Sequence, residues 1–274
     1  MTDPKKIDRS KGALPQKEKG SLQPIIPQSI EEQRRLQLER LAAGFRLFAL
    51  YGFDEGLAGH ITLRDPQFSD HFWVNPLGMN FSQISVSDLL LVKEDGQIIQ
   101  GTRPINPAAF AIHSSIHKAR PDVNSAAHAH SIYGRTFSSL GKLLDPITQD
   151  AALFFQEQAI HDSYGGVAFD VEEGLAIAEA LGEKRTAILQ NHGLLTTGSS
   201  VDIAIWLFIA MDKCCQSQLL ADSAGSPIII SDEIALQAKA QAGTDMILWA
   251  SCLLYTSDAA DDSLRVDLGG RRII

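Results

Sequence analysis

Residues 120–130 of the chain read RPDVNSAAHAH. Residues 125–130 are typical of a short strand, and side chains two residues apart on a strand point to the same face. His128 and His130 therefore project together from one side of this strand. On spacing alone, the two histidines fit a metal site and a pair of structural, hydrogen-bonded histidines equally well.

A third histidine follows in the sequence NHG at residues 191–193. His192 comes after the apolar residues 187–189, and the glycine behind it permits a sharp backbone turn. Divalent cations take nitrogen ligands at about 2.0–2.2 Å. The three histidines therefore predict one metal site with a position left open for a substrate.

These blocks, together with IH at residues 112–113 and Gly198 before a predicted helix, resemble the class II aldolase/adducin family. The resemblance runs from about Leu36 to Ser223. It implies a divalent metal, most often zinc, with iron or manganese as alternatives, and a small-molecule substrate. It also implies a ring-shaped homotetramer with sites between subunits. The residues that match the family's metal ligands are His128, His130 and His192.

The apolar residues alternate between helical and strand periods along the chain. SIEE at residues 29–32 resembles a capping box that opens a long helix, and EDG at residues 94–96 indicates a hairpin. Further helices are predicted at residues 107–119, 131–140, 171–181 and 201–221. Strands are predicted at residues 60–64, 72–74, 89–92, 97–99, 125–130 and 186–190. The pattern predicts an α/β fold, a three-layer α/β/α sandwich, and the resemblance implies a mixed, largely antiparallel sheet.

The chain is predicted to hold one class II aldolase/adducin-like domain at residues 29–251. Residues 1–28 carry several lysines among Pro, Ser and Gln and lack a long apolar core, which predicts a disordered leader. Residues 252–262 read CLLYTSDAADD and resemble the translation of a sequencing adapter. Residues 252–274 are therefore predicted to be a non-native tail, with an ordinary acidic tail as the alternative.

Composition excludes several classes of partner. The 274 residues are 45% hydrophobic and carry a formal net charge of −9. This charge argues against nucleic acids and anionic membrane surfaces, which attract basic proteins. No apolar run reaches the roughly eighteen residues of a membrane helix, so we expect a soluble, cytoplasmic protein. Cys214 and Cys215 are expected to be buried free thiols, because neighbours on a helix point in different directions.

The chemistry that the resemblance implies depends on a metal with an open position. Such a metal polarises a bound carbonyl and stabilises the negative charge of an enolate. In the family's sugar-phosphate aldolases the acid/base is a carboxylate at the position of Ala109, four residues before the match to His113. The residues that match the phosphate ligands are Leu57, His60, Pro107 and Ala108. Because three of these four have no side-chain donor, we expect an unphosphorylated substrate.

Without that carboxylate, other residues must move the proton. The candidate acids or bases are His60, Glu157 and His161. His60 fits a proton carrier and a structural turn histidine equally well, whereas His113 better fits a structural hydrogen bond. Gly59 and Gly78 are candidate substrate-binding positions.

Three functions remain open on the sequence. The first is a metal-dependent lyase that acts through a metal-stabilised enolate on a small oxo- or hydroxy-acid, by retro-aldol cleavage, decarboxylation or epimerisation. The second is a non-haem iron oxygenase of the same family, since three histidines without a carboxylate also suit ferrous iron. The third is a non-catalytic, adducin-like module that associates with actin or supports assembly. The apolar helix predicted at residues 201–221, with Trp206, Leu207, Phe208 and Met211, is expected to offer surface for oligomerisation.

Overall fold

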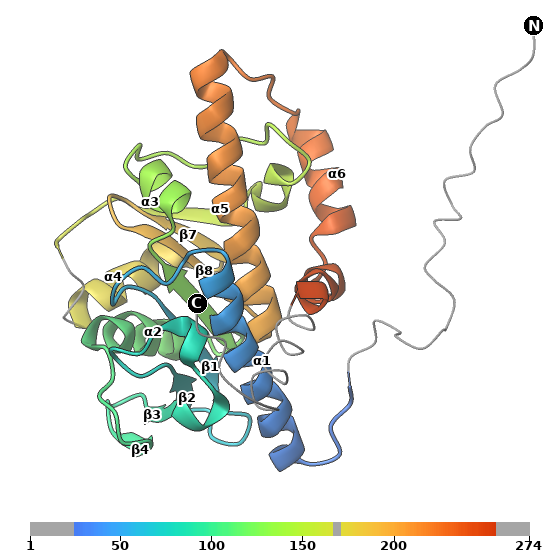
Figure 1. Cartoon of the computed structure of the whole chain (residues 1–274). Coiled ribbons are helices and arrows are strands. Elements are labelled where there is room, and N and C mark those ends of the chain that lie inside the picture. The colour runs from blue at the N-terminus through green and yellow to red at the C-terminus, as the bar shows by residue number, and fades with distance from the viewer. Residues whose placement is uncertain (1–24, 167–170, 256–274) are drawn as a thin grey trace, which may run out of the picture.

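The computed structural model describes residues 25–166 and 171–255, which form one sheet with helices on both faces (Figure 1). Most of the predicted leader and tail lies outside these residues. The strands are β1 His60–Arg64, β2 His71–Val74, β3 Leu90–Lys93, β4 Ile98–Gln100, β5 Ser125–Ala129, β6 Gln158–His161, β7 Thr186–Leu189 and β8 Gly193–Gly198. The helices are α1 Ile30–Leu50, α2 Pro107–Ala119, α3 Ile132–Ser138, α4 Val171–Leu181, α5 Val201–Ala224 and α6 Asp232–Ala242, with a further helix at residues 245–255. Short 3-10 turns lie at Phe81–Gln83, Val86–Asp88 and Ala151–Phe154.

The strands follow one another in the order β4-β3-β2-β1-β5-β8-β7-β6. Every neighbouring pair is antiparallel except β6 and β7, which run parallel. The prediction of a mixed, largely antiparallel sheet is therefore confirmed. β5 lies at the centre, between β1 and β8, and all of its side chains are buried.

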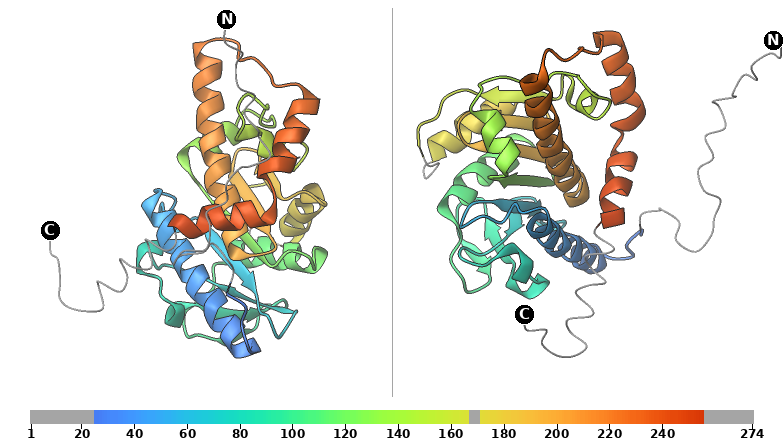
Figure 2. Two further views of the ribbon diagram at one scale, coloured as in Figure 1. Left: turned by 90° about the vertical axis from the view of Figure 1, so that its right-hand side faces the viewer. Right: turned by 45° about the horizontal axis from the view of Figure 1, so that its top comes forward.

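Helices cover both faces of this sheet, as a three-layer sandwich requires. The α1 and α5 helices lie side by side over one face, and α3 packs against α5 there (Figures 1 and 2). Phe45, Phe48 and Phe208 meet in the core of that layer. On the opposite face α2 packs against α4, and Ile112 and Ile177 belong to a second apolar cluster. The predicted α/β/α arrangement is confirmed.

The long first helix begins as the sequence predicts. The Ser29 hydroxyl accepts a hydrogen bond from the Glu32 amide at 3.2 Å, and the Glu32 carboxylate accepts one from the Gln28 amide at 2.6 Å. These contacts satisfy backbone donors that a helix start leaves unpaired. The helix ends at Leu50, followed by Gly52 at φ 74°, a left-handed conformation that glycine adopts without strain.

Two expectations about α5 are wrong. This helix is long and apolar enough to cross a membrane, with a mean hydropathy of 1.2 over its most apolar window, although the sequence predicted no such run. Most of that window, 61%, is buried inside the protein, where α5 packs on β5 and β8. Leu207, Phe208 and Met211 are fully or almost fully buried. Leu207, Phe208 and Met211 therefore belong to the core and do not supply a free surface for oligomerisation, and Trp206 is partly buried.

The sequence pattern missed two strands, β6 and β8, and two helices, α6 and the helix at residues 245–255. Both ends of β8 are glycines, β6 is only four residues long, and α6 has a single buried residue, Ala235. Each of these features weakens the periodic signal on which such predictions rest. The predicted buried free thiols Cys214 and Cys215 are confirmed.

Candidate metal centre

His128 is held on the central strand by backbone pairing on both sides. It lies opposite His60 of β1 and Leu195 of β8. Its Nδ1 is 2.8 Å from the carbonyl oxygen of Leu194. Because a carbonyl oxygen only accepts, Nδ1 must carry the proton, and Nε2 keeps a free lone pair. This arrangement, with one ring nitrogen donating to a carbonyl, is common for histidines that bind metals.

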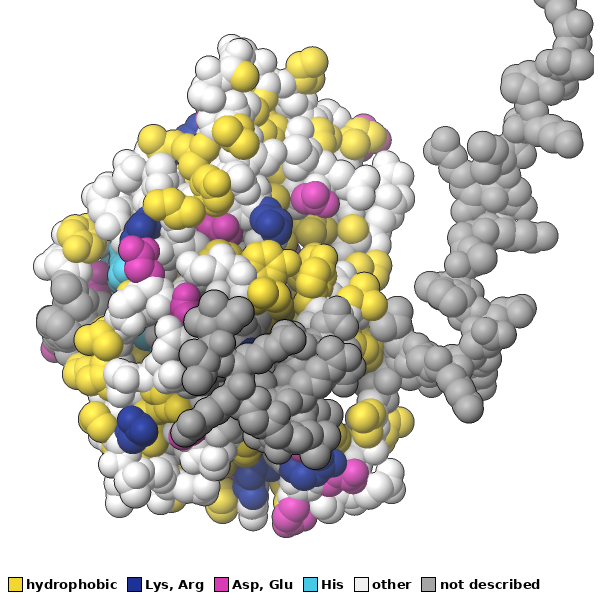
Figure 3. Space-filling view, in the orientation of Figure 1, with side chains coloured by type: hydrophobic (Ala, Val, Ile, Leu, Met, Phe, Trp, Pro, Cys, Tyr) yellow, Lys and Arg dark blue, Asp and Glu magenta, His cyan; other side chains and the backbone are white. Residues whose placement is uncertain are grey.

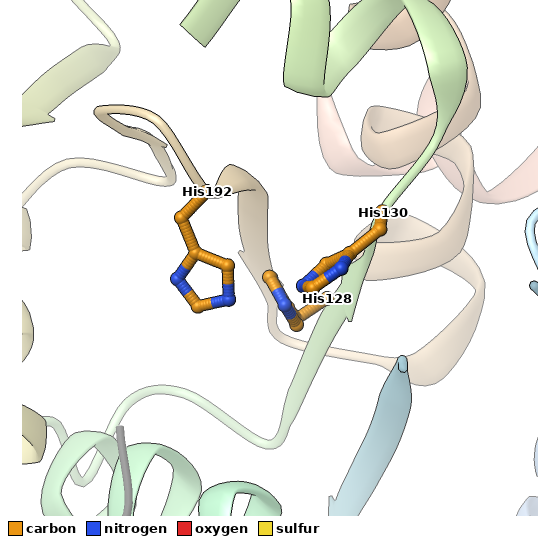
Figure 4. Close-up of side chains that lie close together, drawn as sticks. All are labelled: His128, His130 and His192. Atoms are coloured by element: carbon orange, nitrogen blue, oxygen red, sulfur yellow. The ribbon is translucent and has the colours of Figure 1, made fainter. Parts of the chain in front are cut away.

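His130 and His192 complete the cluster from two other segments. His130 lies just beyond the end of β5, and His192 lies in the turn between β7 and β8 (Figure 4). Asn191 starts this turn at φ 58°. A Cβ on Gly193 would lie 3.1 Å from the Ala129 carbonyl oxygen, so a larger residue would push the turn away from β5. The tight turn therefore brings His192 over the end of the central strand.

The three ligand atoms lie within 4.8 Å of one another. An ion bound at about 2.1 Å would draw them slightly closer together. The donor set consists of neutral imidazole nitrogen atoms, which suit zinc and iron better than calcium or magnesium. His128, His130 and His192 thus fit a divalent metal, as the sequence predicts.

Burial keeps these imidazoles neutral. It is the largest cause that lowers the pKa of His192 to about 4, with His130 and His161 adding to it. Burial also holds the pKa of His128 well below its usual range. Burial and then the Arg135 guanidinium lower the pKa of His130. Because only the neutral imidazole has a lone pair to donate, the cluster is ready to bind a cation at neutral pH.

A cavity of about 340 Å³ opens onto the cluster. Its apolar wall consists of Leu57, Leu77, Pro107, Ala108 and Ile112, and its polar lining includes the histidines and Asn106. Histidine side chains show only as small areas recessed between other atoms on the face drawn in Figure 3. The site is thus a mostly apolar pocket with a few converging nitrogen atoms, the usual form of a small-molecule site.

His60 lies beside the three ligands. It lines the cavity, and its ring centroid is 4.9 Å from that of His128. Its Nδ1 is 2.7 Å from Nε2 of His113, and both side chains are buried. Burial and the neighbouring His113 hold the pKa of His60 well below its usual range. His60 is the first residue of β1, so the interpretation as a turn histidine is wrong, and the structural hydrogen bond expected of His113 is present.

Glu157 lies away from the cluster. It precedes β6 beside Thr186, the first residue of β7, whereas His192 follows the other end of β7. Its carboxylate contacts Lys239 at 3.2 Å and Arg185 at 3.6 Å. Glu157 therefore lies at the far end of the strands and forms ion pairs there, which is typical of a structural residue. We remove it from the set of candidate catalytic residues.

His161 lies nearer to the site, at the end of β6 opposite Leu189. Its Nε2 is 3.2 Å from the Glu173 carboxylate of α4. His161 contributes to lowering the pKa of His192, after burial and His130, but it does not line the cavity. The structure thus makes His161 a neighbour of a ligand and not a group that faces the substrate.

The two candidate glycines differ. Gly59 lines the cavity at φ 103°, and a Cβ there would lie 3.1 Å from Phe81 and 3.3 Å from the His128 carbonyl oxygen. Gly78 has φ 77° with no atom within 4 Å of such a Cβ, and it lines a small adjoining hollow. Gly59 thus forms part of the wall of the site, whereas Gly78 lies in a loop at its edge.

Ala109 faces away from the cavity. It is fully buried and belongs to an apolar cluster with Phe72, Val74, Leu90 and Val92. The preceding residues Pro107 and Ala108 do line the cavity. The position that carries the aldolase carboxylate is therefore part of the core between α2 and the sheet.

Two charged residues near the ligands were missed. Arg135 and Glu55 form an ion pair at 2.8 Å, and both affect the pKa of His130. The sequence gives little signal for them, because each lies in a turn or short helix where charged residues are ordinary. Thr62 was also missed, although it lies two residues after His60 on the same strand face.

Comparisons with known proteins show which family this chain resembles. Residues 39–219 match the family model for the class II aldolase and adducin N-terminal domain. The decarboxylase NovR of Streptomyces niveus is 42% identical over 84% of this chain and 86% of its own length. An enzyme of Streptomyces roseochromogenus subsp. oscitans named 4-hydroxy-3-prenylphenylpyruvate oxygenase/4-hydroxy-3-prenylbenzoate synthase is 42% identical, covering 83% of each chain.

Solved structures agree with the sequence relatives. A structure titled L-fuculose 1-phosphate aldolase from Glaciozyma antarctica PI12 is 41% identical, with a TM-score of 0.82 over 90% of this chain and 96% of that one. All eight strands of the sheet and the histidine cluster lie within residues 39–219, which the family model covers. The chain therefore belongs to the class II aldolase/adducin family.

Proposed function

We propose that this protein is a metal-dependent lyase that acts on a small, unphosphorylated oxo- or hydroxy-acid, by decarboxylation, retro-aldol cleavage or epimerisation. The observation that carries the proposal is the cavity in which three neutral histidines meet a wall of apolar side chains. The family includes metal-dependent aldolases and decarboxylases, and two relatives at 42% identity carry the names of a decarboxylase and an oxygenase.

His128, His130 and His192 would hold the metal, with zinc as our first choice and iron or manganese as alternatives. A divalent cation there supplies Lewis-acid stabilisation of the negative charge that develops on a substrate oxygen. The chain's own task is to present three free lone pairs, and burial together with the Leu194 carbonyl achieves this for His128. These contacts keep His128 neutral, with Nε2 free to bind, in the absence of the ion.

His60 is our candidate for moving the proton. It lines the same cavity as the ligands, and hydrogen bonding through Nδ1 leaves Nε2 for the substrate. His161 acts through His192 in this proposal, as a residue that sets its environment. Gly59 supports the proposed role of His60, because it allows the preceding loop to pass close to the His128 backbone.

The wall of the cavity argues against a phosphorylated sugar. Leu57, Pro107 and Ala108 offer no side-chain hydrogen bond to a phosphate, and Asn106 is occupied by the Ala108 amide and the Leu57 carbonyl. Although one similar structure is titled as a fuculose phosphate aldolase, the buried position of Ala109 leaves no carboxylate for that mechanism at this point. An apolar wall instead favours an acid with an apolar or aromatic body.

A second candidate is a non-haem iron oxygenase. A relative at 42% identity bears the name of an oxygenase acting on a prenylated phenylpyruvate, and an all-nitrogen ligand set also suits iron. The two candidates share the site but differ in the metal and in their need for oxygen. A non-catalytic, adducin-like role in assembly or actin binding is the third outcome.

The experiment is metal analysis followed by turnover. Purified protein is loaded with zinc, manganese or ferrous iron and incubated with a panel of 2-oxo and 2-hydroxy acids, including arylpyruvates, with and without oxygen. Oxygen-independent release of carbon dioxide or an aldehyde, or inversion of a stereocentre, supports the lyase. Strictly oxygen-dependent turnover with iron overturns it in favour of the oxygenase. Protein that binds no metal but sediments with actin filaments points to the third role.

We also propose a homotetramer, the assembly implied by the family resemblance. Exposed apolar side chains gather on α6 and the helix at residues 245–255, and Figure 3 shows apolar surface over this side of the molecule. The residues are Ile234, Leu236, Met246 and Ile247. Light scattering that gives a monomer would contradict this assembly.

A further inference from the structure

A buried carboxylate lies in the middle of the apolar helix α5. Asp212 is 5% exposed, and its neighbours Met211 and Cys215 are fully buried in the apolar core. A carboxylate is costly to bury unless its oxygens accept hydrogen bonds. One oxygen of Asp212 accepts from the backbone amide of Gly134 at 3.0 Å. The proposed site does not use Asp212, although Gly134 lies only four residues after the ligand His130.

The amide that donates to Asp212 belongs to the first turn of α3. The first amides of a helix have no partner within the helix and need acceptors from elsewhere. Ser131 is the N-cap residue of α3, but it makes no side-chain hydrogen bond to these amides, as an N-cap serine commonly does. Asp212 therefore caps α3 from a neighbouring helix, and the packing of α3 against α5 brings the two together (Figure 1).

His130 has less support of its own than His128. The backbone of His128 pairs with a strand on each side, and its ring is hydrogen-bonded to the Leu194 carbonyl. His130 lies one residue beyond the last pair of β5, Ala129 with Leu194, where the chain continues into α3 (Figure 4). Among the residues that the structure describes, none makes a hydrogen bond to the His130 ring. The position of His130 therefore depends on the backbone that follows it.

The start of α3 also lies close to β8, the strand that supports His128. A Cβ on Gly134 would lie 2.5 Å from the Ser131 hydroxyl oxygen and 2.7 Å from the Leu194 side chain. Both distances are shorter than packed atoms allow, so a larger residue here would move α3 away from β8. The first turn of α3 is therefore held between Asp212 on α5 and Leu194 on β8.

We propose that Asp212 is a positioning residue for the metal: it holds the start of α3 and so keeps His130 in place to bind the ion together with His128 and His192. Asp212 neither lines the cavity nor belongs to the three ligands, so it acts through the segment between His130 and Gly134. The proposal rests on the metal site of the proposed function. It does not depend on which acid is the substrate, because metal affinity is measured without one.

The test measures zinc affinity by competition with a chromophoric chelator, using the full chain after its metal has been removed. Asp212→Leu removes the acceptor and frees the start of α3, so binding must pay the entropy of ordering His130 again. We expect the Kd for zinc to rise about 10-fold or more, the usual effect of losing a residue that orients a ligand. Asp212→Asn keeps an oxygen that can accept from the Gly134 amide and should retain an affinity close to that of the wild type. An unchanged affinity in folded Asp212→Leu would overturn the proposal.

Asp202 provides a matched control on the same helix. It is also 5% exposed, but it pairs with Arg40 of α1 and follows the end of β8 that is distant from His192. Asp202→Leu should lower the midpoint of thermal unfolding, as Asp212→Leu does, and should leave zinc affinity unchanged. An equal loss of affinity in the two variants would contradict the proposal, because it would reflect general destabilisation.

Gly134 provides a second test that does not require Asp212→Leu to fold. In the metal-free wild type its amide should exchange slowly with solvent deuterium, because it is buried and bonded to Asp212. Rapid exchange of this amide would contradict the proposal. Gly134→Ala should move the start of α3 away from β8 and also weaken zinc binding, and an unchanged affinity there would count against the proposal.

Zinc binding by the wild type separates this proposal from the proposed function. A wild type that binds no zinc would contradict the metal site, and with it both proposals. Zinc that binds equally tightly to the wild type and to Asp212→Leu would contradict only the role of Asp212.

Discussion

Two groups of three histidines lie side by side in this protein, and they differ in what occupies their nitrogen atoms. In the open group, His128, His130 and His192, one nitrogen of each ring faces a common point. In the closed group, Nδ1 of His60, both nitrogens of His113 and Nε2 of His117 bond to one another or to Thr62. The comparison teaches that residue type does not make a ligand. A histidine can bind a metal where its free nitrogen converges with those of other histidines, and it serves as a hydrogen-bonding element where its nitrogens pair with buried neighbours.

The largest effect should follow from removing a ligand of the open group. His128→Ala and His130→Ala should each abolish stoichiometric metal, because three protein donors are the usual minimum for a tightly held catalytic ion. Metal analysis after dialysis measures this. His71→Ala is the matched control, since His71 pairs with Asp70 at the surface and should leave the metal content unchanged. Full retention in the double variant would remove the distinction between the two groups.

Acid should destabilise the protein through its buried neutral histidines. In the folded protein the pKa of His117 is about 3 and that of His192 about 4, below the unfolded value of 6.5. The unfolded chain therefore binds more protons, and stability present above pH 6.5 is lost as the pH falls toward these values. The loss is about 1.4 kcal/mol per pH unit for each proton taken up.

Urea unfolding of chelator-treated protein at a series of pH values measures this slope. His117→Phe removes one of the buried groups and should make the slope shallower. A free energy of unfolding that is flat between pH 6.5 and 4 would show that the histidines are not held neutral.

Ala109→Glu tests whether the site is a damaged aldolase. The new carboxylate would enter the apolar cluster of Phe72, Val74, Leu90 and Val92, so we expect a loss of about 3 kcal/mol or more. Ala108→Glu, one residue away on the cavity wall and partly exposed, should cost less. Thermal unfolding measures both. Neither variant should cleave fuculose 1-phosphate, and cleavage by the wild type or by Ala109→Glu would restore the phosphate-aldolase assignment.

The smallest effects should come from the glycines near the closed group. Gly59→Ala combines a left-handed φ of 103° with contacts at 3.1 and 3.3 Å, and we expect a cost of about 2 kcal/mol. Gly78→Ala has the conformation without the crowding and should cost about 1 kcal/mol. Chemical denaturation gives both values. Equal costs would show that the close approach of Gly59 to the His128 backbone does not matter.

The open group was predictable from the sequence and the closed group was not. An alternation on one strand and a histidine in a glycine turn are local patterns, so His128, His130 and His192 were found. The closed group depends on the register of β1 against β5 and on how α2 lies over them. A signal was present, because Thr62 follows His60 by two residues on a strand and His117 follows His113 by four on a helix.

The error over Glu157 has a similar cause. Glu157 directly precedes β6, a strand that the periodicity did not predict, so the end of the sheet at which Glu157 lies could not be inferred. The buried orientation of Ala109 likewise depends on which face of α2 meets β2 and β3. Local periodicity identifies the elements, whereas distances between side chains follow from their packing.

The central place of β5 also has a consequence for how the chain reaches its native state. The strands β1 to β4 follow one another directly along the chain, as do β7 and β8, but β5 pairs with β1 and β8 across long stretches of sequence, such as Ser125 with Gly198. Contacts between distant residues form late, because closing long loops costs chain entropy. The two parts of the sheet should therefore fold first and be joined by β5 in a slower step. His128 and His192 meet only when β5 and β8 pair. The metal site would therefore form in the last step of folding, and metal binding would not speed the earlier steps.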